Sequence, residues 1–181
     1  DPPDVAVDAD KLRPIIDVVS RGPAADLLEL ADWAAVRWAA GRRRPFLVAA
    51  GPPRRVRRLP TTRRHDGVGD QLGAVGELAA AVLERGGGVV VIPPAQSPVE
   101  AISAAARRGP TLVVVPAVHR AAAMATALRR RGWTVALVPD DWAKAAAGVD
   151  IVIGARRAAW APCPQLAAAV VIDEHDESLQ E

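Results

Sequence analysis

The chain has very little of several residue types on which whole classes of protein depend. Its 181 residues include one cysteine, Cys163. That excludes an internal disulfide framework and any zinc site built from several cysteines. No apolar run approaches the ~20 residues of a membrane span, and no signal peptide opens the chain. We therefore expect a cytoplasmic protein with no membrane partner.

Overall composition is that of an ordinary globular protein. Half of the residues (50%) are hydrophobic and 24% are charged, which argues against collagenous, coiled-coil and wholly disordered chains. The length suits one domain with a full core, or one domain and part of another. Because the chain does not begin with Met and stops just past a motif, we expect it to be a fragment of a longer protein.

Lysine is almost missing, and arginine is unevenly spread. The chain has 21 arginines and two lysines, and no acid lies between residues 41 and 65. Nine arginines occupy that stretch: Arg42, Arg43, Arg44, Arg54, Arg55, Arg57, Arg58, Arg63 and Arg64. Such a block suits contact with the phosphates of DNA or RNA. A solvated linker in an arginine-rich chain is the other interpretation.

Short apolar runs alternate with helical segments from residue 89 onward. The pattern predicts strands at 89–92, 112–115, 135–138, 151–153 and 167–172, separated by helices at 98–108, 120–131 and 141–147. This alternation is typical of βαβ units, and it predicts a parallel sheet with right-handed crossovers. Residues 167–172 are continuously apolar, so we expect that strand to be buried on both faces.

The first half of the chain predicts fewer elements. A helix is expected over 24–40, with Trp33 and Trp38 divided between the core and its edge. Residues 45–50 are expected to form a short strand, and 71–85 a helix. The segment 51–70 is predicted to be a basic linker between domains.

An acidic run follows the last predicted strand: Asp173, Glu174, His175, Asp176 and Glu177. Open α/β sheets bind ligands at the carboxyl ends of their strands. A carboxylate pair there can hold the Mg²⁺ of a nucleotide and orient a water toward its γ-phosphate. The alternative is a solvated loop after a strand.

The turn after residues 89–92 has the position of a phosphate loop but not its chemistry. Gln96 and Ser97 are the candidate nucleotide-binding residues. The turn has no glycine and no lysine, and its prolines lack N–H donors. A capping box formed by Ser97 and Glu100 also explains it.

Three other sets of residues have both a functional and a structural interpretation. Arg156, Arg157 and Trp160 follow the strand 151–153, where they suit nucleic acid as well as they suit an ordinary surface loop over 156–165. Asp140 and Asp141 are compatible with a metal site, but Asp141 is better placed as a helix cap. His65 and His119 have no partner pattern and are expected to be incidental.

Taken in order, these motifs resemble the PriA family (primosomal protein N′) of superfamily 2 DNA helicases, which act in replication restart. The resemblance is sharp over Ile151–Pro162 and Val170–Glu177, moderate over residues 11–53 and loose between them, where Val113–Pro116 resembles motif Ia. Residues 12–19 and 27–34 look like the end of the family's 3′-DNA-end-binding domain.

The resemblance implies a domain plan. Residues 1–50 would be the end of a small DNA-binding domain, 51–70 the basic linker, and 71–181 an incomplete RecA-like (P-loop NTPase-like) first helicase lobe. The second lobe and the family's cysteine-rich zinc module would lie beyond this chain, so no zinc is expected in it. Residues 51–70 are too few for the family's winged-helix module.

The resemblance also implies roles for residues. Asp173 would coordinate Mg²⁺, Glu174 would polarise the attacking water, and His175 and Asp176 would couple the nucleotide state to DNA. Arg156 would contact DNA phosphate. Departures from the family pattern weaken the catalytic part: Pro93 to Ser97 replace the phosphate loop, and Ala155 replaces a threonine.

Three hypotheses follow. The first is a restart and primosome-assembly protein that binds forked or single-stranded DNA and primosome proteins, with ATPase and helicase activity weak or lost. The second is an active ATP- and Mg²⁺-dependent 3′→5′ helicase with an unorthodox phosphate loop. The third is an unrelated α/β domain that binds a nucleotide or a metabolite.

Overall fold

Four short strands form one parallel sheet with the order β2-β3-β1-β4. The computed structural model describes residues 13–62, 64–65 and 71–179. The strands are β1 (Thr111–Val114), β2 (Val135–Leu137), β3 (Ile151–Gly154) and β4 (Ala168–Val171). Every neighbouring pair is parallel, with Thr111 of β1 beside the first residues of both β3 and β4. The predicted α/β class and parallel sheet are confirmed.

Helices cover both faces of this sheet. They are α1 (Ala25–Arg37), α2 (Arg44–Ala50), α3 (Ala74–Glu84), α4 (Val99–Ala106), α5 (Val118–Arg130) and α6 (Trp142–Ala147), with short 3-10 helices η2 (Arg156–Trp160) and η3 (Glu177–Leu179). Helices α4 and α5 bury Ile102 and Leu128 against one face, and α6 and η2 cover the other with Ala145 and Ala158. Helix α3 packs outside α4. None of the described helices is both long and apolar enough to cross a membrane.

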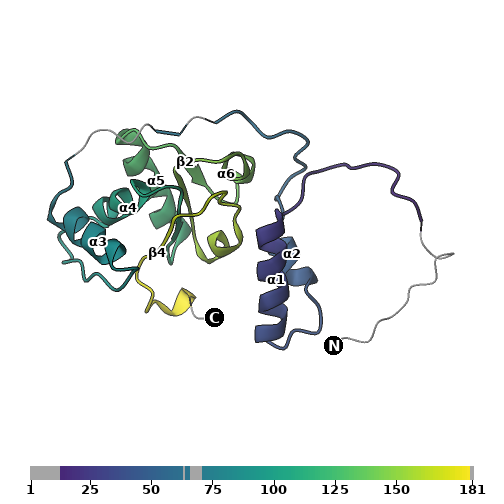
Figure 1. Cartoon of the computed structure of the whole chain (residues 1–181), viewed down its shortest axis with the longest axis horizontal. Helices are drawn as coiled ribbons and strands as arrows, with labels where there is room; N and C mark the ends of the chain where they lie inside the picture. Colours follow the sequence, from purple (N-terminus) through teal and green to yellow (C-terminus); the bar gives the residue numbers. More distant parts are fainter. Residues whose placement is uncertain (1–12, 63, 66–70, 180–181) are drawn as a thin grey trace.

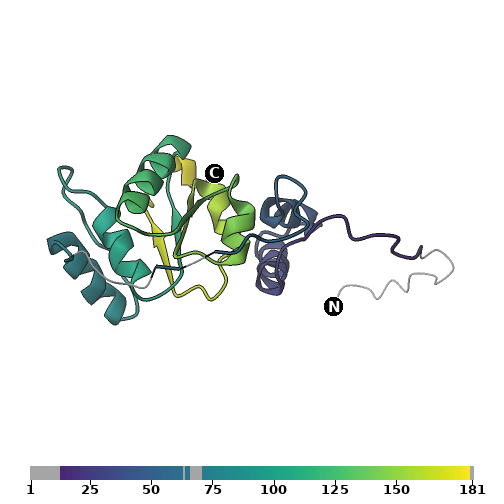
Figure 2. The same cartoon turned by 90° about the horizontal axis from the view of Figure 1, so that it is seen from above.

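The predicted strand at 45–50 is wrong, because these residues form helix α2. Pro45 lies in the first turn of α2, where the missing N–H of proline costs little. The alanines that close the segment also favour a helix. Helices α1 and α2 pack together as a pair beside the sheet (Figures 1 and 2). The indole N–H of Trp142 in α6 donates to the Ala50 carbonyl at 2.9 Å, and this bond holds the end of α2 against α6.

The predicted strand at 89–92 is also wrong. Its backbone makes no hydrogen bond to any described residue, and the Val91 side chain is 84% exposed. A groove of about 370 Å³ separates the segment from β4, with Val89 and Val90 on one side and residues 169–172 on the other. The apolar pattern is that of a strand, but a strand forms only when a neighbouring edge is within hydrogen-bonding distance.

Strand β4 is not buried on both faces as predicted. It is the last strand of the sheet, it pairs only with β1, and Val171 is 50% exposed. Ala168 and Ile172 are buried, so the run is half-buried. Its continuous apolar sequence therefore reflects a groove along an open edge rather than a central place in the sheet.

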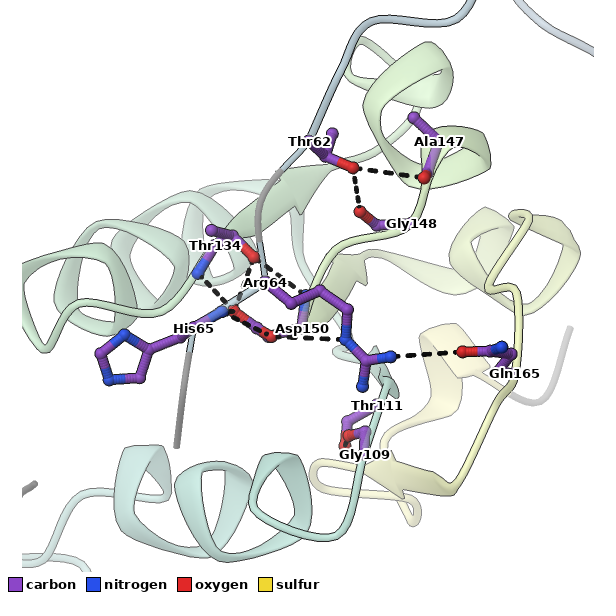
Figure 3. A network of polar contacts seen from close by, with 10 residues as sticks. All are labelled: Thr62, Arg64, His65, Gly109, Thr111, Thr134, Ala147, Gly148, Asp150 and Gln165. Carbon is purple, nitrogen blue, oxygen red and sulfur yellow. Dashed lines mark hydrogen bonds and ion pairs between the residues drawn. The ribbon is translucent and has the colours of Figure 1, made fainter. Parts of the chain in front are cut away.

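Asp150 is a buried carboxylate at the amino end of β3, and several groups bond to it (Figure 3). Its side-chain oxygens accept hydrogen bonds from the Thr134 hydroxyl at 2.6 Å and from the Thr134 N–H at 2.9 Å. The His65 backbone N–H donates to both oxygens, at 2.9 and 3.1 Å. Because a buried charge is costly unless it is fully bonded, this network fixes where the segment before α3 must run.

The same segment is held at two more points (Figure 3). The Thr62 hydroxyl bonds to the carbonyls of Ala147 and Gly148, just before β3. The Arg64 guanidinium lies 3.8 Å from an Asp150 oxygen, and it donates to the Gln165 side chain at 3.3 Å. Thr62, Arg64 and His65 are therefore anchored to the amino end of the sheet, opposite the edge where ligands of such sheets bind.

His65 has a structural role that the sequence did not indicate. Besides its backbone bond to Asp150, its ring packs edge-on against the Trp133 indole with 5.3 Å between centroids. Trp133 belongs to the core cluster beneath α4 and α5. His65 therefore joins the basic segment to the core.

Replacing Asp150 by alanine would leave the N–H groups of Thr134 and His65 without their acceptor. We expect the free energy of unfolding to fall by about 2–4 kcal/mol, the range for losing bonds to a buried charged acceptor. Urea denaturation followed by circular dichroism measures this. Asp140→Ala, at an exposed carboxylate, is the matched control, and equal losses in the two variants would contradict the assigned role.

Candidate functional site

The acidic turn starts directly after β4, and its first residue, Asp173, forms an ion pair. Asp173 has a φ of 50°, a left-handed conformation that aspartate tolerates better than most residues. Its carboxylate forms an ion pair with the Arg120 guanidinium in the first turn of α5. A cation there opposes the helix dipole, so the carboxylate offsets an unfavourable position. The predicted Mg²⁺ ligand thus has an arginine partner that sequence reasoning missed.

Asp176 is held within the same turn. Its Oδ1 accepts bonds from the Ser178 hydroxyl at 2.7 Å and from the Ser178 N–H at 3.0 Å. These two bonds lower the pKa of Asp176 below its usual value, and the charges of His175 and Arg120 act in the same direction. The Ser178 hydroxyl also lies 3.3 Å from the Pro116 carbonyl oxygen. The turn is therefore folded over the carboxyl end of β1.

Glu174 faces the groove beside β4. It lines that groove together with Ile92, the residue directly before the turn Pro93 to Ser97. Both Glu174 and His175 are exposed. The structure therefore brings one predicted catalytic residue near the start of the predicted nucleotide turn.

The nucleotide turn itself offers few donors. Gln96 and Ser97 are exposed, but the Gln96 N–H already donates to the Pro93 carbonyl at 2.9 Å. Since Pro93 and Pro94 have no N–H, only Ala95 and Ser97 have backbone donors without an acceptor among the described residues. A phosphate cradle requires several converging N–H groups, which this turn does not provide.

The predicted capping box is wrong in part. Ser97 Oγ accepts a bond from the Val99 N–H at 3.3 Å, as a capping serine does. The Glu100 carboxylate does not accept a hydrogen bond from the Ser97 N–H, as a capping box requires. It lies against Gly73 instead. A Cβ at Gly73 would lie 2.6 Å from the Glu100 Oε2, so a larger residue at the start of α3 would displace this carboxylate.

The described residues do not provide a metal site on their own. No three or more histidine, cysteine, aspartate or glutamate side chains come together in the part of the chain that the structure describes. Asp173 is the predicted Mg²⁺ ligand, but its carboxylate is already paired with Arg120. Mg²⁺ prefers six oxygen ligands in octahedral geometry, and this turn alone does not supply them.

Asp141 precedes α6 as predicted, but its side chain does not cap that helix. It turns back to accept the Leu137 N–H at 3.1 Å, and it pairs with Lys144 at 2.8 Å and with Arg129 at 3.2 Å. Burial acts to raise the pKa of Asp141, but the bonds from Lys144 and Leu137 and the two cationic charges outweigh it and lower the pKa. Asp141 therefore joins α5, β2 and α6.

The basic segment exposes the arginines that the sequence singled out. Arg54, Arg55, Arg57 and Arg58 are exposed, and none has an ion-pair partner among the described residues. Val56 between them is half-buried and is bonded to residues 20–21: the Arg21 N–H donates to the Val56 carbonyl at 2.7 Å. The Val56 N–H in turn donates to the Ser20 hydroxyl oxygen at 3.0 Å. We define Arg54, Arg55, Arg57 and Arg58 as the arginine quartet. Arg63 lies outside the described residues.

Residues 156–160 form the 3-10 helix η2, where a loop was expected. Ala158 is buried against the sheet, and this places Arg156 and Arg157 on the exposed side. Trp160 closes η2 with its ring 5.3 Å from that of Phe46 in α2. A groove of about 480 Å³ lies here, between η2 and the helical pair.

Cys163 is not a candidate nucleophile. Burial raises the pKa of its thiol to about 11, although the charge of Arg64 acts to lower it. The thiolate is the reactive form, so this cysteine is unreactive at neutral pH.

Comparison with known proteins adds no further identification. No protein-family model matches the chain, and no match is found among curated proteins.

The Asp176–Ser178 contact predicts a dependence on pH. Because its folded pKa is lowered, Asp176 stabilises the turn above its ordinary pKa of about 4, and that stabilisation is lost as pH falls through the folded value. Ser178→Ala should raise the pKa of Asp176 toward its ordinary value, while Ser178→Thr, which keeps the hydroxyl, should preserve the lowered pKa. Carbon-detected NMR titration of the Asp176 carboxyl measures both. An unchanged titration in Ser178→Ala would show that the contact is not formed in solution.

Proposed function

We propose that this chain acts by binding DNA, as part of a PriA-like replication-restart protein that recognises forked or single-stranded DNA and nucleates primosome assembly. Its ATPase and helicase activity is weak or lost. The observation that carries this proposal is the difference between its two sets of predicted residues. The arginine quartet is exposed without ion-pair partners among the described residues, whereas Asp173 is paired with Arg120.

The sheet supports the proposal that residues 71–181 are a RecA-like lobe. Arg156 follows β3 and Asp173 follows β4, and these two strands lie on either side of β1. Both residues therefore follow the carboxyl ends of strands, where α/β sheets bind ligands. In this proposal Arg156 and Arg157 contact DNA phosphate, and His175 and Asp176 couple the nucleotide state to DNA.

Weak hydrolysis follows from the turn and the ion pair. The turn from Pro93 to Ser97 has two backbone N–H groups without an acceptor among the described residues, and it has no lysine to approach the β- and γ-phosphates. Asp173 would have to leave Arg120 before it could hold a metal ion. A protein with these features binds DNA through its arginines without needing ATP.

An active helicase is the second candidate, and one observation favours it. Glu174 and Ile92 line the same groove, so the acid proposed to polarise water lies near the proposed nucleotide turn. ATP with Mg²⁺ would be its cofactors, with the nucleotide phosphates supplying part of the metal coordination.

Removing the arginine quartet should weaken DNA binding and flatten its dependence on salt. Each arginine that contacts a phosphate contributes about one to the slope of log K against log salt. Fluorescence anisotropy with forked DNA at several salt concentrations measures this for Arg54, Arg55, Arg57 and Arg58 replaced together by alanine. The matched control replaces Arg85, Arg108, Arg130 and Arg131, which are also exposed and remove the same charge. Equal losses of DNA affinity in the two variants would show only an effect of net charge. That result would overturn the assignment of the arginine quartet as a DNA-binding site.

Phosphate release separates the two candidates. For a binding protein we expect no release above that of Asp173→Asn, with or without forked DNA, and fork binding unchanged in that variant. Fork-stimulated release that is lost in Asp173→Asn but kept in the control Asp140→Asn would instead establish the helicase. A coupled phosphate assay on the protein measures both.

A further inference from the structure

The five tryptophans are used in two different ways. Trp133 and Trp142 are buried, and their indole N–H groups donate to the Ser103 hydroxyl at 3.3 Å and to the Ala50 carbonyl at 2.9 Å. Trp33, Trp38 and Trp160 have no hydrogen-bond partner for the indole N–H among the described residues. Trp33 is 57% exposed and Trp38 is 61% exposed. The prediction that one of Trp33 and Trp38 packs in the core is therefore wrong.

The exposed Trp33 and Trp38 and the half-buried Trp160 form a continuous row with Phe46. Trp33 and Trp38 meet edge-on at 5.8 Å between centroids. Trp38 stacks on Phe46 at 6.1 Å with an interplanar angle of 26°, and Phe46 lies 5.3 Å from Trp160. We call these four rings the aromatic platform. They come from α1, α2 and η2, so folding has brought together aromatic side chains that are distant in the sequence.

Positive charge surrounds this platform. The 480 Å³ groove beside it is lined by Trp38, Phe46, Trp160, Arg156 and Arg157, together with small or apolar residues, and by no carboxylate. Arg42, in the turn between α1 and α2, and Arg44, the first residue of α2, are exposed. A row of exposed and half-buried rings beside a positively charged groove suits a ligand with flat faces and negative charge.

We propose that the aromatic platform and its arginine-lined groove bind the unpaired bases of single-stranded nucleic acid. This inference rests on the DNA-binding function proposed above, and it names the form of DNA that this face recognises. Bases stack on the exposed face of Trp38 and in the groove beside Trp160. The guanidinium groups of Arg156 and Arg157 bind the adjoining phosphates.

Single strands fit this site better than duplex DNA or a protein partner. Base faces are hidden inside a duplex, and only unpaired bases can stack on a side-chain ring. A protein surface would have to supply carboxylates for the arginines as well as an apolar patch for the rings. A single strand carries bases that stack on the rings and phosphates that bind the arginines. Each stacked base contributes about 1–3 kcal/mol to the binding free energy.

The test compares binding of an oligothymidylate of about 15 nucleotides, within the range of known single-strand sites, with binding of a blunt duplex. Intrinsic tryptophan fluorescence and anisotropy are the measurements. Trp38→Ala should weaken oligothymidylate binding about tenfold and leave duplex binding unchanged. Trp38→Phe, which keeps a flat ring, should retain most of the affinity. Val36→Ala is the matched control, because Val36 is exposed on the same helix and lies outside the platform.

Each outcome decides the inference. Selective loss in Trp38→Ala with rescue by Trp38→Phe supports it. Unchanged oligothymidylate binding in both Trp38→Ala and Trp33→Ala overturns it, and so does equal loss for duplex. In those cases continued fork binding through the arginine quartet would keep the proposed DNA-binding function. If the protein binds neither oligothymidylate nor forked DNA, both proposals fall, and a protein partner for the platform becomes the better explanation.

Discussion

The carboxylate of Asp150 determines how the two halves of this chain are joined. It is 3% exposed and accepts bonds from Thr134 and His65, so the segment before α3 must pass across the amino end of the sheet. An acid in this position would destabilise the fold if any of those donors were missing. Because the donors come from residues far apart in the sequence, the carboxylate links the basic segment, β2 and β3 into one unit. The arginines depend on this link for their position relative to the sheet.

The two edges of the sheet have different chemistry as a result. The amino edge carries the Asp150 network and the anchored segment. The carboxyl edge carries Arg156 after β3 and the acidic turn after β4, and the groove beside β4 connects Glu174 to the turn that begins after Ile92. Arg156 and Arg157 lie in η2, and η2 contacts the helical pair of α1 and α2 where Trp160 packs against Phe46. Exposed basic groups therefore flank the parallel sheet. In the acidic turn, Asp173 and Asp176 are already bonded to Arg120 and Ser178.

The sequence predicted those elements whose pattern depends only on neighbouring residues. The alternation of apolar runs and helices placed β1 to β4 and α4 to α6 within a residue or two. Failures occurred where the outcome depends on distant partners. Residues 45–50 suit a helix or a strand, although Pro45 was an available signal for a helix start. Residues 89–92 have the pattern of a strand, but a groove separates them from the open edge of β4, so they do not pair with it.

The same limit applied to the candidate site. The acidic turn and the exposed arginines were found from residue type and position. The partnership of Asp173 with Arg120 and the bonds to Asp150 were not, because nothing local in the sequence shows which charges meet across 53 or 85 positions. The aromatic row was missed for the same reason, since only the fold brings Phe46 beside Trp160.

The anchoring of Val56, Thr62 and His65 has a consequence for how Arg57 and Arg58, which lie between them, would meet a polyanion. A flexible basic tail loses conformational entropy when it binds, and that loss subtracts from its affinity. Here the backbone is held at Val56 through Ser20 and Arg21, and again at Thr62 and His65, so much of this ordering has already occurred during folding. If the segment binds DNA as proposed, it would act as a preorganised surface, and its affinity would be set by counterion release and side-chain ordering more than by backbone ordering.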